Sequence, residues 1–177
     1  RTLCADADAG LIARLMRVAL KQLTLTDFRN YPRLSLDLSC QHVVITGENG
    51  AGKTNLLEAV SFLSPGRGMR RAVLSDVARA GSTNGFAVNA VIETPDGEVA
   101  LGTGTFGETP GGEVARRLRV NGAAQKSTDV LTEHLRVVWV TPQMDGLFSG
   151  PASDRGRIFD RLVLSIDPLH GSTSRDF

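Results

Sequence analysis

The sequence predicts an α/β fold in which a mixed β-sheet, with an antiparallel meander, surrounds one helix that follows a glycine-rich loop. Three observations favour this fold class. Segments with strand periodicity lie on both sides of a segment with helical periodicity. The glycine-rich sequence GENGAGKT connects a short apolar run to that helix. Further along, residues 84–126 contain alternating runs separated by strong turn signals.

The first element is predicted after Met16. Residues 1–15 show no clear periodicity, and we interpret them as an extension that precedes the natural start of the chain. An amphipathic helix over residues 9–16 is the alternative. From Met16 to Phe28, β-branched and apolar residues recur near period two, which predicts a strand. Residues 33–39 then alternate strictly between leucine and other residues, which predicts a half-buried strand.

The next two elements flank the glycine-rich sequence. Residues 42–46 form a short apolar run, typical of a strand buried on both faces. The helix is expected to begin near Lys53 and to end at the turn 64–66. Its buried stripe is predicted from the spacing of four apolar residues, which are Leu56, Leu57, Val60 and Leu63.

The meander is predicted from its turns. Hairpins are expected at the sequence TPDG, residues 94–97, and at Asn121–Gly122, because both offer a residue that adopts positive φ easily. Ser127 follows the last of these strands and has a hydroxyl that can accept a backbone N–H bond. We therefore expect it to cap a short helix that reaches Leu135.

Two further elements are predicted near the end of the sequence. Residues 136–141 are rich in valine and indicate a buried strand, with Trp139 in the core and Pro142 closing the segment. Ser153 is expected to cap a helix that continues through Leu164.

Composition excludes several classes of protein. Of the 177 residues, 41% are hydrophobic and 22% charged, which excludes a disordered tail, a collagen-like fibre and a disulfide-stapled miniprotein. The net charge of +1 gives no sign of nucleic-acid binding, although residues 16–80 carry nine basic and five acidic side chains. Cys4 and Cys40 are predicted to be free thiols. No apolar run approaches about 18 residues and no signal-peptide pattern occurs, so we expect a cytoplasmic protein without a membrane span.

The glycine-rich sequence matches the pattern G-x-x-x-x-G-K-[ST]. Its members are Gly47, Glu48, Asn49, Gly50, Ala51, Gly52, Lys53 and Thr54. The glycines permit backbone conformations that bring N–H groups against phosphate, and the positive end of the helix points to the same place. Lys53 supplies a mobile charge for the β- and γ-phosphates, and the Thr54 hydroxyl is placed to ligate Mg²⁺. The sequence therefore predicts a nucleotide-phosphate site.

Hydrolysis would require more than this loop. A carboxylate at the end of an apolar strand has to hold Mg²⁺, and another group has to orient water. The stretch RLVLSID ends at Asp167, but Ser165 interrupts it and Pro168 follows. Asp167 is therefore predicted to lie at a helix end or in a loop, and no catalytic base is evident.

Longer stretches resemble one family. LTLTDFRNY at 23–31, GENGAGKTNLLEAVSFLSPGRGMRR at 47–71 and TPQMDGLFSGPASDRGRIFDRLV at 141–163 resemble the N-terminal head of the RecF family of bacterial DNA-repair ATPases. The resemblance implies lobe I of an ABC-type ATPase head over residues 16–170, with an unstructured end over 171–177. The signature motif and Walker B strand of that family do not occur in this sequence, which implies an N-terminal fragment of such a head.

The resemblance also implies further site residues. Gln143 matches the Q-loop, whose side chain faces Mg²⁺ and the attacking water, and an ordinary loop glutamine is the alternative. Arg29 and Asn30 occupy a turn that lies near the nucleotide in the family, and surface turn residues are the alternative. ATP and Mg²⁺ are thus the expected cofactors, with Thr54 and Gln143 as the expected metal contacts.

Arginines are the candidate DNA contacts. Those that follow the predicted helix are Arg67, Arg70 and Arg71. Three guanidiniums within five residues favour contact with a phosphate backbone, and a solvated charged loop is the alternative. A second group, Arg116, Arg117 and Arg119, cannot act together, because a strand places Arg117 and Arg119 on one face and Arg116 on the other.

The resemblance implies an ATP-dependent DNA-binding protein of recombinational repair and replication. In such proteins ATP joins two heads, and the homodimer binds duplex DNA, gapped DNA or a single-strand/double-strand junction and supports RecA loading together with RecO and RecR. Weak hydrolysis is expected of the whole homodimer and negligible hydrolysis of this chain alone. Two alternatives are the nucleotide-binding subunit of an ABC transporter, with Phe28 or Tyr31 stacking on adenine, and a small-molecule P-loop kinase.

Overall fold

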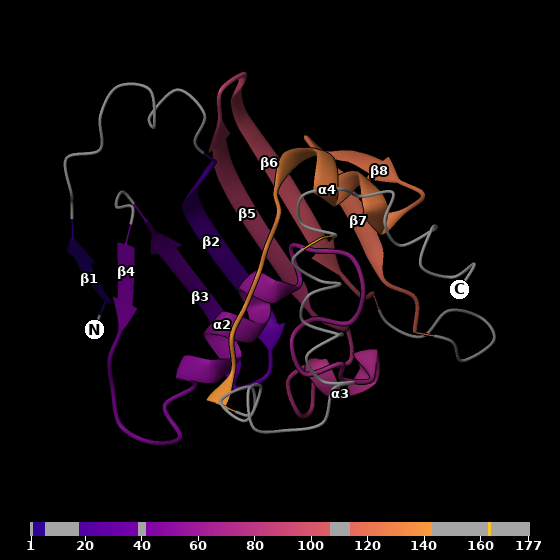
Figure 1. Cartoon of the computed structure of the whole chain (residues 1–177). Coiled ribbons are helices and arrows are strands. Elements are labelled where there is room, and N and C mark those ends of the chain that lie inside the picture. The colour runs from indigo at the N-terminus through magenta and orange to yellow at the C-terminus, as the bar shows by residue number, and fades with distance from the viewer. Residues whose placement is uncertain (1, 6–17, 39–41, 107–113, 143–162, 164–177) are drawn as a thin grey trace. The chain divides into compact units, whose positions relative to one another are not determined.

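The computed structural model describes residues 2–5, 18–38, 42–106, 114–142 and 163 (Figure 1). Residues 1–135 form one compact unit and residues 136–177 form a second. A six-stranded antiparallel sheet with the order β3-β2-β5-β6-β7-β8 occupies most of the first unit. Its strands are β2 (Ala19–Phe28), β3 (Tyr31–Asp37), β5 (Ala87–Thr94), β6 (Gly97–Gly104), β7 (Arg117–Val120) and β8 (Ala123–Gln125). The predicted strands within 16–28 and 33–39 and the predicted meander are confirmed.

Tight turns set the register of the meander. Pro95 and Asp96 join β5 to β6, and Asn121–Gly122 joins β7 to β8 with φ values of 49° and 81°. Two successive residues with positive φ give the two-residue hairpin turn whose twist matches that of the strands. The Asn121 Oδ1 also accepts a hydrogen bond from the Ala100 N–H at 2.8 Å, which ties this turn to β6. Both predicted turns are confirmed.

One face of the sheet forms the core, and helix α2 (Lys53–Ser61) packs on that face. The apolar side chains that point inward include Leu23, Leu25, Val88, Ile92, Leu101 and Leu118. Beside them, the rings of Phe28, Phe62 and Phe86 meet edge to face with centroids 5.5–5.9 Å apart, a favoured aromatic geometry. This cluster joins the end of β2 to the end of α2, so it fixes the helix relative to the sheet.

The buried side of α2 differs from the prediction. Leu56 and Leu63 are buried as expected, but Leu57 is 52% exposed and Val60 is half-buried. The core side instead carries Glu58 and Ala59, both of which are fully buried. An exposed leucine is common in proteins, whereas a buried carboxylate requires partners. Glu58 is therefore the informative residue of this helix.

Strand β4 (His42–Ile45) leads into the glycine-rich loop, and within the described residues it pairs only with β1 (Thr2–Ala5). The strand was predicted correctly, but its predicted burial on both faces is wrong, because Val43 and Val44 are 38% and 52% exposed. A two-stranded ribbon has no second layer of side chains to cover it. β1 lies in a segment where no element was predicted, and the alternative helix over 9–16 lies outside the described residues.

The residues after β8 confirm one prediction and correct another. The Ser127 hydroxyl accepts from the Asp129 N–H at 3.1 Å and caps the 3-10 helix η1 (Thr128–Val130), as expected, and α4 (Leu131–His134) follows directly. Residues 136–141 do not form the predicted strand, and Trp139 is half-buried rather than in a core. The helix predicted from Ser153 lies outside the described residues.

Arg116 closes the carboxyl end of α2. Its guanidinium donates to the carbonyl oxygens of Phe62, Ser64 and Gly66, while its Nε donates to the Thr103 Oγ1 at 2.8 Å. Helix ends leave carbonyls without intrahelical partners, and a cation there also suits the helix dipole. Burial lowers the pKa of Arg116 to about 10, which keeps the group charged at neutral pH.

Replacing Arg116 with methionine is expected to lower the free energy of unfolding by about 2–4 kcal/mol, since hydrogen bonds to charged groups contribute about 1.5–3 kcal/mol. The neighbouring Arg117 points to the other face and is exposed, so the same change there is expected to cost less than about 1 kcal/mol. Urea unfolding of the two variants measures both values. Equal losses would show that the carbonyl contacts of Arg116 contribute nothing specific.

Candidate nucleotide-phosphate site

The candidate site is the loop from Gly47 to Thr54, between β4 and α2. Gly50 and Gly52 have φ values of 86° and 97°, which side chains with a Cβ rarely adopt. A Cβ on Gly52 would also lie 2.6 Å from the Asn30 Nδ2 and 2.7 Å from the Tyr31 hydroxyl. The glycine at position 52 is therefore required both by its φ and by the close approach of the β2–β3 turn.

Lys53 lies within the curve of the loop. Its ammonium donates to the carbonyl oxygens of Gly47 at 2.7 Å and Glu48 at 2.6 Å. These two bonds fix a positive charge beside the loop backbone, and no carboxylate among the described residues pairs with it. The side chain arises from the first residue of α2, so the lysine charge and the positive end of the helix dipole act at the same place.

The amino end of α2 is open to a ligand. Its N-cap residue is Gly52, which offers no side-chain oxygen, and the first turn contains no acidic residue. The loop residues Glu48–Ala51 and Thr54 are exposed. Free N–H groups at a helix start bind anions through hydrogen bonds and the dipole together, so an accessible phosphate group fits this end of the helix.

A buried ion network lies behind the loop and is centred on Glu58, whose side chain is 0% exposed. Arg29 binds it in a bidentate manner, with Nε to Oε2 at 3.0 Å and a terminal nitrogen to Oε1 at 2.7 Å. Arg70 donates to Oε2 at 3.0 Å. Arg29 also donates to the Asp76 carbonyl oxygen at 2.7 Å, just inside α3 (Leu74–Val77). The network thus joins the β2–β3 turn, α2 and α3.

Asn55 extends this network toward the loop. Its Nδ2 donates to the Asn30 Oδ1 at 2.9 Å, and its Oδ1 accepts from Arg70 at 2.9 Å. Asn30 in turn lies against Gly52, as described above. Arg29 and Asn30 therefore support the loop from the side, and the Arg29 guanidinium is directed toward Glu58 and α3 rather than standing free as a surface turn residue.

The three arginines after α2 are not equivalent. Arg70 is held by Glu58 and Asn55, whereas Arg67 and Arg71 are exposed and form no ion pair with the described residues. Their loop has a fixed shape, since the Met69 N–H donates to the Ser61 Oγ at 2.7 Å and a Cβ on Gly68 would lie 2.9 Å from the Phe62 ring. Of these three arginines, only Arg67 and Arg71 therefore have guanidiniums available to bind an external phosphate.

Gln143 lies outside the described residues, so its predicted role as a Q-loop residue stays a prediction. Within the described ranges, no group of three His, Cys, Asp or Glu side chains could hold a metal ion. The roles of Glu58 and Asn55 were missed by sequence reasoning. The signal for Glu58 was an acidic residue between Leu56 and Ala59 on an apolar helix, which is uncommon unless that residue is paired.

A glycine-rich loop between a strand and a helix, with a lysine held inside it, is the phosphate-binding element of the P-loop NTPases. The family model for the RecF/RecN/SMC N terminal domain matches residues 19–126, which is more than half of the chain. The protein therefore belongs to this family.

Curated relatives agree with this assignment. The chain is 59% identical over 161 residues to the DNA replication and repair protein RecF of Rhizobium meliloti (strain 1021), covering 91% of this chain and 42% of that relative. It is 62% identical over 162 residues to the protein of the same name from Agrobacterium fabrum, covering 91% and 43%. The chain thus spans 42–43% of the length of these relatives.

Solved structures show the same fold. The recombination mediator protein RecF-ATPrS of the RecFOR pathway superimposes with a TM-score of 0.70 at 26% identity, over 86% of this chain and 40% of that chain. The SMC head domain from Thermotoga maritima gives a TM-score of 0.51 at 18% identity, over 75% and 51%. These matches confirm the predicted fold class and family resemblance, and nothing in them favours an ABC transporter subunit. No helix in the described part of the chain is long and apolar enough to cross a membrane.

Proposed function

We propose that the protein binds ATP at residues 47–54 and, as part of a RecF-like ATPase, couples ATP binding to DNA binding in replication and repair. The observation that carries this proposal is the Lys53 ammonium, fixed inside a glycine loop at the open amino end of α2. The relatives named DNA replication and repair protein RecF support the biological role. The solved RecF-ATP structure supports ATP as the nucleotide.

Thr54 is the residue that would hold Mg²⁺ in this site, since its exposed hydroxyl lies beside the loop at the second position of α2. An oxygen donor suits this hard cation, which would neutralise phosphate charge and fix the orientation of the β- and γ-phosphates. We assign Gln143 to the same metal on the family resemblance. The γ-phosphate offers contacts that ADP lacks, so ATP would favour association of two heads into a homodimer.

The proposed DNA contacts are Arg67 and Arg71. Arg70 serves a different role, because its bonds to Glu58 and Asn55 connect residues 67–71, the arginine loop, to the helix that begins at the phosphate site. If ATP binding displaced α2, the ion pair between Glu58 and Arg70 would therefore move the arginine loop with it. The RecFOR pathway named for the solved relative supports RecO and RecR as partners, with gapped or duplex DNA as the ligand and RecA loading as the outcome.

The DNA proposal predicts a change in salt dependence. Replacing Arg67 and Arg71 with glutamine is expected to weaken duplex binding and to reduce the slope of log affinity against log salt by about 1.8, since each lost phosphate contact removes about 0.9. Fluorescence anisotropy with a labelled duplex, in ATP and Mg²⁺ at several salt concentrations, measures the slope. The control replaces Arg33 and Lys126, two exposed cations remote in sequence from this loop. If both double variants change the slope equally, only the general charge matters and the assignment of Arg67 and Arg71 is wrong.

A further inference from the structure

Arg116 contacts more than the carboxyl end of α2. Its guanidinium donates to the carbonyl oxygens of Phe62, Ser64 and Gly66, and both of its terminal nitrogens lie 3.2 Å from the Ser64 oxygen. Phe62 is the C-cap residue of α2, whereas Ser64 and Gly66 belong to the segment that leads from this helix into the arginine loop. A planar group with five N–H donors in a fixed geometry therefore orients alternate carbonyls of residues 62–66.

The guanidinium of Arg116 is itself held in place. Its Nε donates to the Thr103 Oγ1 at 2.8 Å, and this threonine of β6 is only 4% exposed. Its Cζ lies 5.4 Å from the centre of the Phe62 ring. The group forms no ion pair with the described residues, so carbonyl dipoles compensate its charge. Because a half-buried cation is costly without hydrogen bonds, the carbonyls have to stay oriented toward Arg116.

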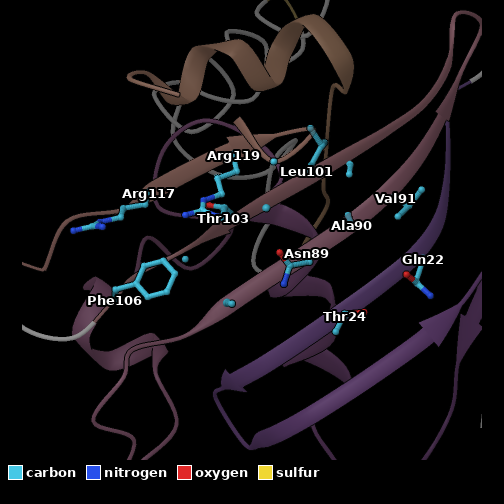
Figure 2. A pocket seen from close by; sticks show the side chains of 15 residues that line it. Gln22, Thr24, Asn89, Ala90, Val91, Leu101, Thr103, Phe106, Arg117 and Arg119 are labelled. Carbon is cyan, nitrogen blue, oxygen red and sulfur yellow. The ribbon is translucent and has the colours of Figure 1, made fainter. Parts of the chain in front are cut away.

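The two other arginines nearby cannot take the place of Arg116. Arg117 and Arg119 line a groove on the outer face of the sheet, opposite α2, and Figure 2 shows both side chains there. Successive residues of a strand point to opposite faces, so Arg116, directly before β7, is the one that is directed toward α2. A change at Arg117 therefore removes the same charge without touching the segment after α2.

The bond to Gly66 acts directly on Arg67. The Gly66 carbonyl and the Arg67 N–H belong to one planar peptide unit, so the contact with Arg116 fixes the backbone that precedes Arg67. Gly66 has a φ of 89°, and a Cβ there would meet nothing within 4 Å. Packing therefore does not hold this residue, and glycine has the most conformational freedom of all residues. The hydrogen bond from Arg116 supplies the restraint that packing does not.

The arginine loop is held at two further points, and both lie on α2. The Met69 N–H donates to the Ser61 Oγ at 2.7 Å, and Arg70 donates to the Glu58 Oε2 at 3.0 Å. None of the N–H groups of residues 66–70 donates to a carbonyl oxygen of the described residues, so side chains rather than a backbone ladder hold this loop. The backbone on both sides of Arg67 is thus fixed, by Arg116 before it and by Ser61 after it.

We infer that Arg116 is a positioning residue for the arginine loop, whose bonds to Ser64 and Gly66 preform the backbone from which Arg67 reaches a phosphate group. The inference rests on the proposed function of Arg67, and it adds a residue that lies 50 positions beyond Gly66 in the sequence. A loop that is already ordered loses less conformational entropy when a ligand binds, so preformation raises affinity without adding a contact. Arg116 stays with the carbonyls and does not touch the ligand.

The first test uses proteolysis of the 177-residue protein without any ligand. Trypsin cleaves after arginine only where the chain opens locally, and mass spectrometry measures the initial rate at the Arg67–Gly68 bond. Arg116→Met is expected to raise this rate about tenfold or more, because the loop loses its restraint. Two controls are expected to stay within about threefold. Arg117→Met removes the same charge from the other face, and Ile92→Ala truncates a fully buried core side chain.

The second test asks whether Arg116 acts through Arg67. Arg116→Met is expected to weaken binding of a labelled duplex in ATP and Mg²⁺ about threefold or more, but less than about 1.5-fold when Arg67 is already glutamine. A direct DNA contact of Arg116, or a general loss of folding, would weaken both backgrounds equally. Arg116→Lys keeps the charge but reaches fewer carbonyls, so intermediate cleavage and affinity are expected. It replaces Arg116→Met in both tests if that variant does not fold.

Two outcomes would overturn the inference. One is cleavage at Arg67–Gly68 that is no faster in Arg116→Met than in Ile92→Ala, and the other is equal weakening of duplex binding in the two backgrounds. The salt slope of the Arg67 and Arg71 variant reports separately on the proposed function. An unchanged slope with faster cleavage would reject the DNA contacts alone, whereas a changed slope with unchanged cleavage would reject the role of Arg116 alone.

Discussion

Replacing Glu58 with glutamine is expected to lower the free energy of unfolding by about 3–5 kcal/mol, the usual cost of breaking a buried ion pair. The carboxylate accepts three hydrogen bonds from two arginines within a fully buried site. Glutamine has nearly the same shape, but its NH₂ group would face a guanidinium donor. The change therefore leaves buried donors unsatisfied and removes the charge that compensates Arg29. Urea unfolding followed by circular dichroism measures the loss.

A matched surface pair provides the control. Arg79 donates to the Asp27 carboxylate at 2.7 Å, with exposed side-chain fractions of 40% and 26%. Replacing Arg79 with glutamine also breaks a short ion pair, yet exposed pairs contribute about 1 kcal/mol or less. If Glu58→Gln does not fold, Arg70→Gln still tests the network, since it removes only the most exposed of its three charged groups. A loss from Glu58→Gln no larger than that from Arg79→Gln would contradict the structural role of the network.

Replacing Lys53 with alanine is expected to weaken ATP binding by about 10- to 100-fold, equivalent to the 1.5–3 kcal/mol that a charged hydrogen bond contributes. The ammonium is the charge that the loop itself presents to phosphate, and its two protein partners are neutral carbonyls. Isothermal titration calorimetry with ATP and Mg²⁺ measures the affinity.

Lys53→Arg is the matched control for this effect. Arginine keeps the positive charge but replaces a compact ammonium with a planar fork, so an intermediate affinity is expected. The unfolding free energy should change by less than about 1 kcal/mol in both variants, because the Lys53 contacts lie on an accessible loop. An alanine variant that binds ATP as tightly as the unsubstituted protein would remove Lys53 from the site.

Features governed by local geometry could be predicted from the sequence. The loop at 47–54 and the Asn121–Gly122 turn depend on glycines whose backbone angles few other residues adopt, so their positions are visible in the sequence. The opposite orientations of Arg116 and Arg117 followed from strand alternation alone. The Ser127 cap was found for the same reason, since it needs only one hydroxyl and the turn that follows.

Features that depend on distant partners were not predictable. The buried side of α2 was expected at Leu57, yet it carries Glu58 and Ser61. The polar face is buried because Arg29, 29 residues earlier, and Arg70, 12 residues later, supply the charges that Glu58 needs. A helical wheel that ranks residues by hydrophobicity cannot represent such compensation. Arg116 is similar, because its carbonyl partners, which directly follow α2, lie about fifty residues earlier in the chain.

Two predictions for valine-rich segments were wrong for the same reason. They are the strand over 136–141 and the burial of β4 on both faces. Valine-rich runs in the sequence predict strands, but burial and pairing depend on the layers beside them. β4 forms its ladder with β1 alone within the described residues, so Val44 stays exposed. The placement of Arg29 and Asn30 near the nucleotide came from the family resemblance and stays a prediction, and the structure adds the contacts by which these residues reach Glu58 and Gly52.

The central claim is that this protein recognises the phosphates of a nucleotide, and a calorimetric comparison of ATP, ADP and adenosine tests it most directly. The loop, Lys53 and the open end of α2 all suit phosphate rather than base or sugar, so ATP and ADP should bind while adenosine gives no measurable heat at the same concentrations. Binding of ATP should fall in Lys53→Ala and remain in the Arg33 and Lys126 variant. Equal affinity for adenosine and ATP, or unchanged ATP binding without Lys53, would contradict the account.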